Sequence, residues 1–371
     1  MIVGVPKEIK NQEYRVALVP AGVHSLVADG HIVIIEQSAG EGSGISDAEY
    51  VAAGAAIRPS AEDVFAQAEM IVKVKEPLPE EYPLLRAGQV LFTYLHLAPA
   101  PELTTALLEQ EIIGIAYETV QLEDGSLPLL TPMSEVAGKL SVQVGAHFLE
   151  KAHGGSGVLL AGVPGTPPAQ VAIIGGGVVG TNAAKIALGM GANVTIVDIN
   201  LERLRYLADV LPGRLAVLAS NAYTVERAVA DADLVVGALL VPGAKAKKVV
   251  TRAMMAQMRK GSVVVDVAID QGGCVEGAAP TTHDDPVFNI DGVTMYCVAN
   301  LPGAVSRTST FALTNATFPY VSKLANLGYK GALAADPALF KGLNVLRGDL
   351  VCQAVADGVG MDYTACTIAD L

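Results

Sequence analysis

The chain has 371 residues and a mass of 38.3 kDa, more than one hydrophobic core usually supports, so we expect two domains. Apolar residues make up 51% of the sequence and charged residues 17%, which excludes a largely disordered chain and indicates that much surface is buried between domains or subunits. The formal net charge of -13 argues against a nucleic-acid-binding surface, and the one locally basic stretch (Lys245, Lys247 and Lys248) is expected to be a solvated loop.

The first 128 residues alternate between strand-like and helix-like patterns. Runs rich in β-forming residues occupy positions 2–5, 31–36, 70–75, 89–97 and 112–120. Helical apolar spacing occupies positions 20–28, 47–53 and 101–110, and Ser46 with Glu49 fits a capping box. This alternation predicts a parallel, doubly wound sheet of the flavodoxin-like type.

A long helix and a second alternating series follow. Ser134 is an N-cap candidate, and no Pro occurs between it and Lys151, so one long helix is expected over these residues. Six strand-like runs come next: VAIIG, NVTIVD, LAVLAS, DLVVGALL, SVVVDVAID and TMYCVAN. Their number and order match a complete dinucleotide-binding domain.

The end of the chain has a different pattern. Helical stretches at about 308–327 and 335–371 lack strands, so we expect them to return to the first domain and complete it. The predicted fold class is therefore α/β with two doubly wound domains. A Rossmann domain at residues 129–306 is inserted into a flavodoxin-like domain formed by residues 1–128 and 307–371.

The segment from Gly175 to Gly180 reads GGGVVG and fits the pattern G-x-G-x-x-G between a strand and a helix. Gly175 permits the tight turn, Gly177 lets the backbone approach a pyrophosphate, and Gly180 lets the helix pack close to the strand. Asp198 ends the next strand, roughly 20 residues further on, where an acid binds the ribose hydroxyls. Its carboxylate would repel a 2′-phosphate, so NAD is favoured over NADP. The alternative is a Gly-rich turn that is packed for structural reasons.

Other polar residues stand where open α/β sheets bind ligands, at the carboxyl ends of predicted strands. Lys75, His96, Asp270 and Asn300 each end a strand-like run, and Arg15 follows the first one. Each has an ordinary alternative: a solvated edge lysine, a structural histidine, a turn-forming aspartate or a surface arginine. Their convergence on the same edge of two successive sheets favours a functional site.

The residue types suit one kind of reaction. Arg15 and Lys75 offer charge-assisted hydrogen bonds to a small carboxylate. His96 and Asp270 supply an acid and a base, while a nicotinamide would supply or accept the hydride. No Ser or Cys nucleophile is indicated.

Export, membrane insertion and metal binding are not expected. The start MIVGVPKEIK lacks a signal-peptide pattern, and no stretch reaches about 18 uninterrupted apolar residues, so we expect a cytoplasmic protein without membrane contact. Cys274, Cys297, Cys352 and Cys366 form neither a CxxC pair nor a zinc-ligand spacing, so they should be reduced.

Seven segments of the sequence resemble the alanine dehydrogenases over nearly the whole chain. They are MIVGVPKEIKNQEYRVAL, VKVKEPLPEEY, LFTYLHLA, LTPMSEVAG, IIGGGVVGTNAAK, VDVAIDQGGC and YCVANLPGAVSRTSTFALTNAT. The resemblance implies an NAD-dependent enzyme, a homohexamer, that interconverts L-alanine with pyruvate and ammonium. It assigns the substrate carboxylate to Arg15 and Lys75 and the acid–base chemistry to His96 and Asp270. Leu130 and Met133 would form a small apolar neighbourhood that suits a methyl side chain.

The resemblance also implies a set of cofactor contacts beside Gly175 and Gly180. They are Ser134, Gly177, Val178, Asp198, Arg203, Ser220, Leu239, Leu240, Val267 and Asn300. One departure is that Ala278 and Ala279 precede Pro280 where relatives often carry a basic residue, which puts a cofactor contact in that loop in question. Two other hypotheses are a transhydrogenase-type coupling subunit, which requires a membrane part that this chain lacks, and a non-enzymatic NAD sensor.

Overall fold

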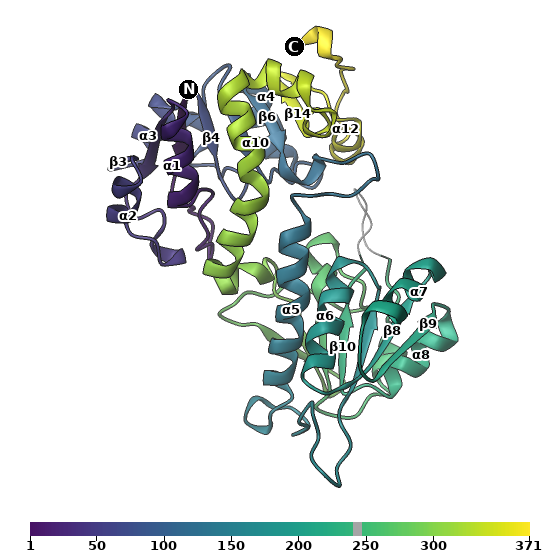
Figure 1. The fold of residues 1–371 in the computed structure, drawn as a ribbon. Helices are drawn as coiled ribbons and strands as arrows, with labels where there is room; N and C mark the ends of the chain where they lie inside the picture. The colour runs from purple at the N-terminus through teal and green to yellow at the C-terminus, as the bar shows by residue number, and fades with distance from the viewer. Residues whose placement is uncertain (240–246) are drawn as a thin grey trace. The chain divides into compact units, whose positions relative to one another are not determined.

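The computed structural model describes residues 1–239 and 247–371, which divide into two compact units. Unit 1 contains Met1–Met133 and Val305–Leu371, and unit 2 contains Ser134–Ala304 (Figure 1). Each unit is built around its own sheet, with helices against its faces. The expected α/β class is therefore confirmed.

The sheet of unit 1 has, among the described residues, eight strands in the order β15-β14-β6-β5-β4-β1-β2-β3. Their bounds are β1 Ile2–Val5, β2 Ile32–Glu36, β3 Ala56–Arg58, β4 Met70–Val72, β5 Val90–Thr93, β6 Ile113–Ala116, β14 Leu343–Leu346 and β15 Asp349–Leu350. Strands β1 to β6 pair in parallel. The five strands predicted from the sequence have the neighbour order 2-1-3-4-5, which is the flavodoxin-like order. Short β3 extends that sheet at one edge.

The expectation that residues 335–371 lack strands is wrong. Strands β14 and β15 form an antiparallel hairpin, and β14 pairs with the edge of β6. The two turn residues Arg347 and Gly348 have φ of 49° and 94°, so the turn needs two left-handed residues. Such turns usually carry Asn-Gly or Asp-Gly, and Arg-Gly gives only half of that signal.

Helices cover this sheet. They are α1 Pro20–Ala28, α2 Asp47–Ala52, α3 Ala61–Gln67, α4 Pro101–Glu109, α10 Ser306–Ala335, α11 Pro337–Lys341 and α12 Gln353–Val359. The capping box predicted at Ser46 and Glu49 is confirmed in both of its hydrogen bonds. Helix α10 breaks its regular geometry at Gly328, whose φ is 66°. The buried core between sheet and helices is largely Val, Ile and Leu.

The sheet of unit 2 has, within the described part of the chain, seven strands in the order β12-β13-β11-β10-β7-β8-β9. Their bounds are β7 Gln170–Ile174, β8 Asn193–Asp198, β9 Leu215–Ala219, β10 Leu234–Gly237, β11 Val263–Asp266, β12 Val287–Ile290 and β13 Val293–Tyr296. The six predicted strands are all present and parallel, in the dinucleotide-binding order 3-2-1-4-5-6. Strand β12, which the sequence analysis missed, pairs antiparallel with β13.

Helix α5 (Thr131–Phe148) begins and ends three residues earlier than expected. Ser134 is therefore not its N-cap but lies in its first turn. Pro132 is tolerated there because the first turn makes no use of its missing N–H. The other helices of unit 2 are α6 Val178–Gly189, α7 Leu201–Val210, α8 Ala222–Ala230 and α9 Arg252–Met255. None of the described helices combines the length and apolar character needed to cross a membrane.

Candidate active site

Three of the predicted site residues lie at one edge of the unit 1 sheet. Arg15 follows β1, Lys75 follows β4 and His96 follows β5, and these three strands are neighbours. Parallel strands end at the same edge, so their loops share one side of the sheet. The structure thus brings a guanidinium, an ammonium and an imidazole to the same edge of this unit.

Arg15 is buried, with 2% of its surface exposed, and it is held by Glu13. Its Nε donates to Glu13 Oε1 at 2.7 Å, and its second terminal nitrogen donates to the other carboxylate oxygen. Nη1 faces the sulfur of Met133 at 3.0 Å. Burial alone would lower the pKa of Arg15, but the hydrogen bonds and charge of Glu13 outweigh it and raise that pKa. The guanidinium is therefore a fixed, charged group.

Lys75 is half-buried, and its backbone is held by a carboxylate from the loop after β1. Glu8 Oε1 accepts from the backbone N–H of Val74 at 2.6 Å and from that of Lys75 at 3.3 Å. The other oxygen of Glu8 lies 3.4 Å from the Nζ of Lys73, which also donates to Glu81 at 2.6 Å. Burial raises the pKa of Glu8 despite Lys73. This buried network joins the loops after β1 and β4.

His96 has a φ of 49°, an unusual conformation for a residue other than glycine. Glu118, from the loop after β6, accepts from the backbone N–H of His96 at 2.6 Å and from that of Leu95 at 3.2 Å. The imidazole is exposed and stacks on Tyr94, with ring centroids 5.7 Å apart and planes 8° apart. Tyr94 is itself fixed, because its hydroxyl donates to the carbonyl of Leu129 at 2.5 Å. The backbone and ring of His96 are thus both positioned.

Glu76 adds a negative charge at the same edge. Burial would raise its pKa, but the ion pair with Lys10 outweighs this, with smaller contributions from Lys75 and His96, and lowers the pKa of Glu76. Among the described residues, the Oε2 atom of Glu76 is buried with no hydrogen-bond partner.

The Gly-rich loop of unit 2 follows β7 and begins α6. Gly175 has a φ of 107°, which favours glycine. A Cβ atom on Gly180 would lie 1.8 Å from the carbonyl oxygen of Gly175, so only glycine allows the helix to pack this close. A Cβ on Gly177, in contrast, would meet no protein atom within 4 Å. Gly177 is the N-cap of α6 and has no side-chain cap, as expected for a helix end that receives an anion.

Asp198 ends β8 and contacts this loop. Its Oδ2 accepts from the backbone N–H of Gly176 at 2.5 Å, and its Oδ1 accepts from that of Asn200 at 2.8 Å. Arg203 lies across the same loop, where Nε donates to the carbonyl of Gly176 and Nη2 to the hydroxyl of Thr181, both at 2.7 Å. The guanidinium of Arg203 is thus tied to the loop, and an arginine held in this way is poorly placed to receive a 2′-phosphate.

Most of the remaining residues expected to contact the cofactor lie at the same edge. Ser220 follows β9, Leu239 follows β10, Val267 follows β11, Asn300 lies four residues beyond the end of β13, and Val178 begins α6. Leu239 packs near Gly175, and Asn300 has a φ of 64°. Ser134 is half-buried in the first turn of α5. Leu240 lies outside the described residues.

Asp270 is exposed in a short 3₁₀ helix, Val267–Gln271, that follows β11 directly. The turn that holds it is organised by Asp266, which accepts from the backbone N–H groups of Ala268, Cys274 and Val275 at 3.1, 2.9 and 3.0 Å. Burial raises the pKa of Asp266, although these hydrogen bonds oppose it. Asp270 therefore projects from a backbone loop that is fixed at both ends.

Lys248 belongs to the basic stretch that was expected to be a solvated loop, and its side chain is exposed, but its ammonium group also binds the protein. Nζ donates to the carbonyl oxygens of Gly272 and Val275, at 2.6 and 2.9 Å, and so ties down the turn after Asp270. Lys245, in the same run, lies outside the described residues. The sequence signal was only a charge run, which does not distinguish a bound lysine from a solvated one.

Sequence reasoning missed the carboxylates that hold the site. Glu8 and Glu13 both precede the chosen Arg15, and Asp266 precedes Asp270 by four residues, yet none was singled out. The available signal was acidic residues at strand ends beside basic candidates, since a buried cation requires a partner. Lys73 gave no signal, because in sequence it resembles the neighbouring Lys75.

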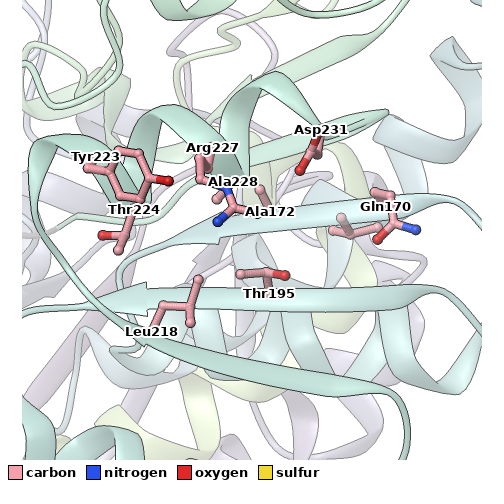
Figure 2. Close-up of a pocket in the computed structure, with 10 residues that line it drawn as sticks. Gln170, Ala172, Thr195, Leu218, Tyr223, Thr224, Arg227, Ala228 and Asp231 are labelled. Atoms are coloured by element: carbon pink, nitrogen blue, oxygen red, sulfur yellow. The ribbon is translucent and has the colours of Figure 1, made fainter.

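A pocket of about 330 Å³ lies elsewhere in unit 2, between α8 and the face of β7 to β9 (Figure 2). Its lining includes Gln170, Thr195, Tyr223, Arg227 and Asp231. Gln170 begins β7, so the pocket reaches toward the edge opposite the Gly-rich loop. It contains none of the predicted site residues and is not the candidate active site.

Comparisons with known proteins find similar sequences and structures over nearly the whole chain. The family described as alanine dehydrogenase/PNT matches through its N-terminal domain over residues 4–137 and its C-terminal domain over residues 141–353. An alanine dehydrogenase of Methanococcus maripaludis is 60% identical over 98% of both chains. A solved structure of an L-alanine dehydrogenase has a TM-score of 0.94 and 57% identity, covering 97% of this chain and 99% of the other. A transhydrogenase structure from Sinorhizobium meliloti has a TM-score of 0.81 and 27% identity, covering 95% and 100%.

Proposed function

The chain belongs to the alanine dehydrogenase/PNT family, and from this premise we propose that it is an NAD-dependent amino-acid dehydrogenase acting on L-alanine. The reaction is reversible oxidative deamination, in which L-alanine, NAD⁺ and water give pyruvate, ammonium, NADH and a proton. In this proposal residues 1–128 and 307–371 form the substrate domain and residues 129–306 the NAD-binding domain. A cytoplasmic location would suit these small polar metabolites.

The observation that carries the proposal is the set of fixed charges at the edge of the unit 1 sheet. Arg15 is held by Glu13 at two nitrogens, and the backbone of Lys75 is held by Glu8. Two cations at one sheet edge suit the carboxylate shared by alanine and pyruvate. The sulfur of Met133, at 3.0 Å from Arg15, places a small apolar surface beside that carboxylate site, where a methyl group would lie.

The residues of the Gly-rich loop fit a dinucleotide. A Cβ atom on Gly177 would meet no protein atom within 4 Å, so the backbone there is open to a ligand. Gly175 and Gly180 have the backbone roles that the motif needs, and Asp198 ends the neighbouring strand. When bound, the nicotinamide supplies the hydride acceptor and donor. The carboxylate of Asp198, with Arg203 tied to the loop, favours NAD over NADP. Ser134, Val178, Ser220, Leu239, Leu240, Val267 and Asn300 are proposed as further contacts.

His96 and Asp270 are proposed to handle the protons of the reaction. Oxidised alanine is an imine, which water attacks before ammonia leaves, so one group must take a proton and another must give one. The imidazole of His96 and the carboxylate of Asp270 both project from fixed turns at strand ends. Arg15 and Lys75 contribute by orienting the substrate, which is catalysis by positioning.

NADH oxidation by the purified chain tests this function directly. Pyruvate plus ammonium should support turnover, with glyoxylate and larger 2-oxo acids slower. The variant Gly177→Ala should fold normally, because its Cβ meets no protein atom, yet lose NADH binding, because that Cβ would occupy the space proposed for the pyrophosphate. NADH binding without pyruvate-dependent oxidation would instead support a coupling subunit or a sensor.

A further inference from the structure

Three side chains of types that can ligate a metal ion lie together at the end of α5, away from the proposed active site. They are His147, Glu150 and His153, and one ligand atom of each lies within 4.8 Å of the others. The imidazole rings have centroids 3.8 Å apart, and Nε2 of His153 is 3.7 Å from a carboxylate oxygen of Glu150. Two of the six histidines of the chain are thus in one cluster.

The backbone explains why these three residues share a face. His147 lies in the last turn of α5, and His153 ends the 3₁₀ helix Lys151–His153. Glu150 lies between these two helices in extended backbone, with φ of -66° and ψ of 144°, as the N-cap of the 3₁₀ helix. Glu150 donates its backbone N–H to the carbonyl of His147 and accepts from that of His153, each at 3.1 Å. These two turn hydrogen bonds bring the three residues together at the end of α5.

The segment that carries the cluster is held in place by the chain that follows it. The backbone N–H groups of Gly155 and Gly157 donate to the carbonyls of Glu150 and Leu149, at 3.1 and 2.8 Å. A Cβ on Gly155 would lie 2.3 Å from the carbonyl oxygen of Phe148, so the chain crosses the helix end in close contact. Ser156 donates to the carbonyl of Gly261 at 2.8 Å. Because these hydrogen bonds hold the backbone of the turn, its side chains could bind an ion with little backbone rearrangement.

The cluster lies at the opposite edge of the unit 2 sheet from the Gly-rich loop. Gly261, to which this segment is bonded, precedes β11, and Gly145 of α5 packs on Leu234, the first residue of β10. The Gly-rich loop follows the last residue of β7 instead. Figure 1 shows α5 running along this sheet to its far end. The cluster is therefore independent of the cofactor contacts proposed above.

We propose that His147, Glu150 and His153 bind a divalent transition-metal ion of the zinc class. Two imidazole nitrogens and one carboxylate oxygen form a ligand set that suits Zn²⁺, with water in the remaining position. Bonds of about 2.0 to 2.2 Å require ligand atoms about 3.3 Å apart in tetrahedral geometry, so small side-chain rotations close the site. No metal site was expected from the sequence, because the four cysteines lack a zinc-ligand spacing.

An ion pair between His153 and Glu150 would be the ordinary explanation of the cluster. It accounts for two of the three residues but not for His147, whose ring lies against that of His153 with the planes inclined by 37°. A metal ion binds both rings in their neutral form and neutralises the carboxylate as well.

Zinc binding to the intact, untagged chain after treatment with EDTA tests the proposal. Competition with a chromophoric zinc indicator should give one site per chain, and His147→Ala and His153→Ala should each weaken it at least ~10-fold, since even outer-shell changes cost this much. Glu150→Gln should weaken it too. His24→Ala, which removes an exposed histidine of α1, should leave the affinity unchanged. Mg²⁺ and Ca²⁺, which prefer oxygen ligands, should not compete.

Thermal melting gives a readout that does not depend on the indicator. Zinc should raise the melting temperature of the parent chain, because an ion that binds only the folded state stabilises it, and should not raise that of the double variant His147→Ala/His153→Ala. NADH binding should be the same with and without zinc. The proposal is overturned if the folded double variant binds zinc as tightly as the parent, or if the parent binds none.

Discussion

Arg15 and Glu13 form a buried ion pair. Its effect on stability comes mainly from the cost of leaving one charge buried without its partner, and less from the attraction between the two charges. The side chains are 2% and 0% exposed, so neither charge has water to replace a lost partner. Removing one member of a buried pair costs about 3 to 5 kcal/mol because it leaves an uncompensated charge. Replacing one residue of the pair should therefore destabilise the protein more than replacing both.

We expect Glu13→Gln to lower the free energy of unfolding by an amount in that range and to raise the KM for pyruvate, because the guanidinium of Arg15 loses its orientation. Denaturant melts and steady-state kinetics measure the two effects. The double variant Arg15→Met/Glu13→Gln should recover much of the stability and none of the activity. Equal destabilisation in the single and double variants would contradict the ion-pair explanation.

His96 and Asp270 should be dispensable for folding and needed for turnover, because both side chains are exposed and their turns are held by other residues. His96→Ala and Asp270→Asn should each bind NADH while kcat falls by roughly 10²-fold or more, the usual scale for a lost acid or base. If the two act together, the double variant should be little worse than the poorer single variant. Near-normal kcat in both folded single variants would refute the assigned roles.

The elements that sequence could predict are those with a strong local pattern. The apolar runs of β1 and β7, and the capping box at Ser46, agree with the structure because local residues suffice to specify them. Strands β3, β12, β14 and β15 were missed. Each lies at or near a sheet edge and is only two to four residues long, so pairing with a neighbouring strand, not its own pattern, makes it a strand.

Helix α6 contains two glycines whose replacement should have opposite effects. Gly180→Ala places a methyl group 1.8 Å from the carbonyl oxygen of Gly175, so α6 must move away from β7. We expect a lower melting temperature and at least ~10-fold weaker NADH binding, because the helix N-terminus no longer faces the anion. Gly189→Ala meets no atom within 4 Å and replaces glycine by a better helix former, worth up to about 1 kcal/mol.

Melting curves and fluorescence titration with NADH distinguish the two variants. A Gly180→Ala chain that binds NADH like the parent would show that close packing of α6 on the loop is not required. Gly189→Ala controls for the addition of a methyl group within the same helix.

At the scale of the whole molecule, the sequence predicted which residues of the candidate site lie at strand ends, but not which other residues contact them. Lys75, His96 and Asp270 could be chosen as candidates because the carboxyl ends of parallel strands bind ligands in open α/β sheets generally. The carboxylates that hold the backbone of these residues could not be predicted in the same way. Glu8 and Glu118 reach the backbone of Lys75 and His96 from loops that follow other strands, and only the order of the strands brings those loops together.

The composition of the chain leads to a prediction about assembly. Charged residues make up 17% of the sequence, against about 25% in a typical domain, and mean hydropathy is +0.42. Large apolar side chains also stay exposed in both units, among them Ile32, Val51, Leu159 and Ile199. A monomer would leave this apolar surface in water, whereas a closed symmetric oligomer buries part of it.

We therefore expect a homohexamer, as the family resemblance implies, with a solution mass of about 230 kDa from six copies of a 38.3 kDa chain. Light scattering at micromolar concentration measures this mass directly. Because the expected contacts are apolar, the mass should persist when salt is raised to about 1 M, where surface ion pairs are screened within about 3 Å. Dissociation in salt would assign the assembly to ion pairs instead, and a mass of one chain at low salt would contradict the prediction.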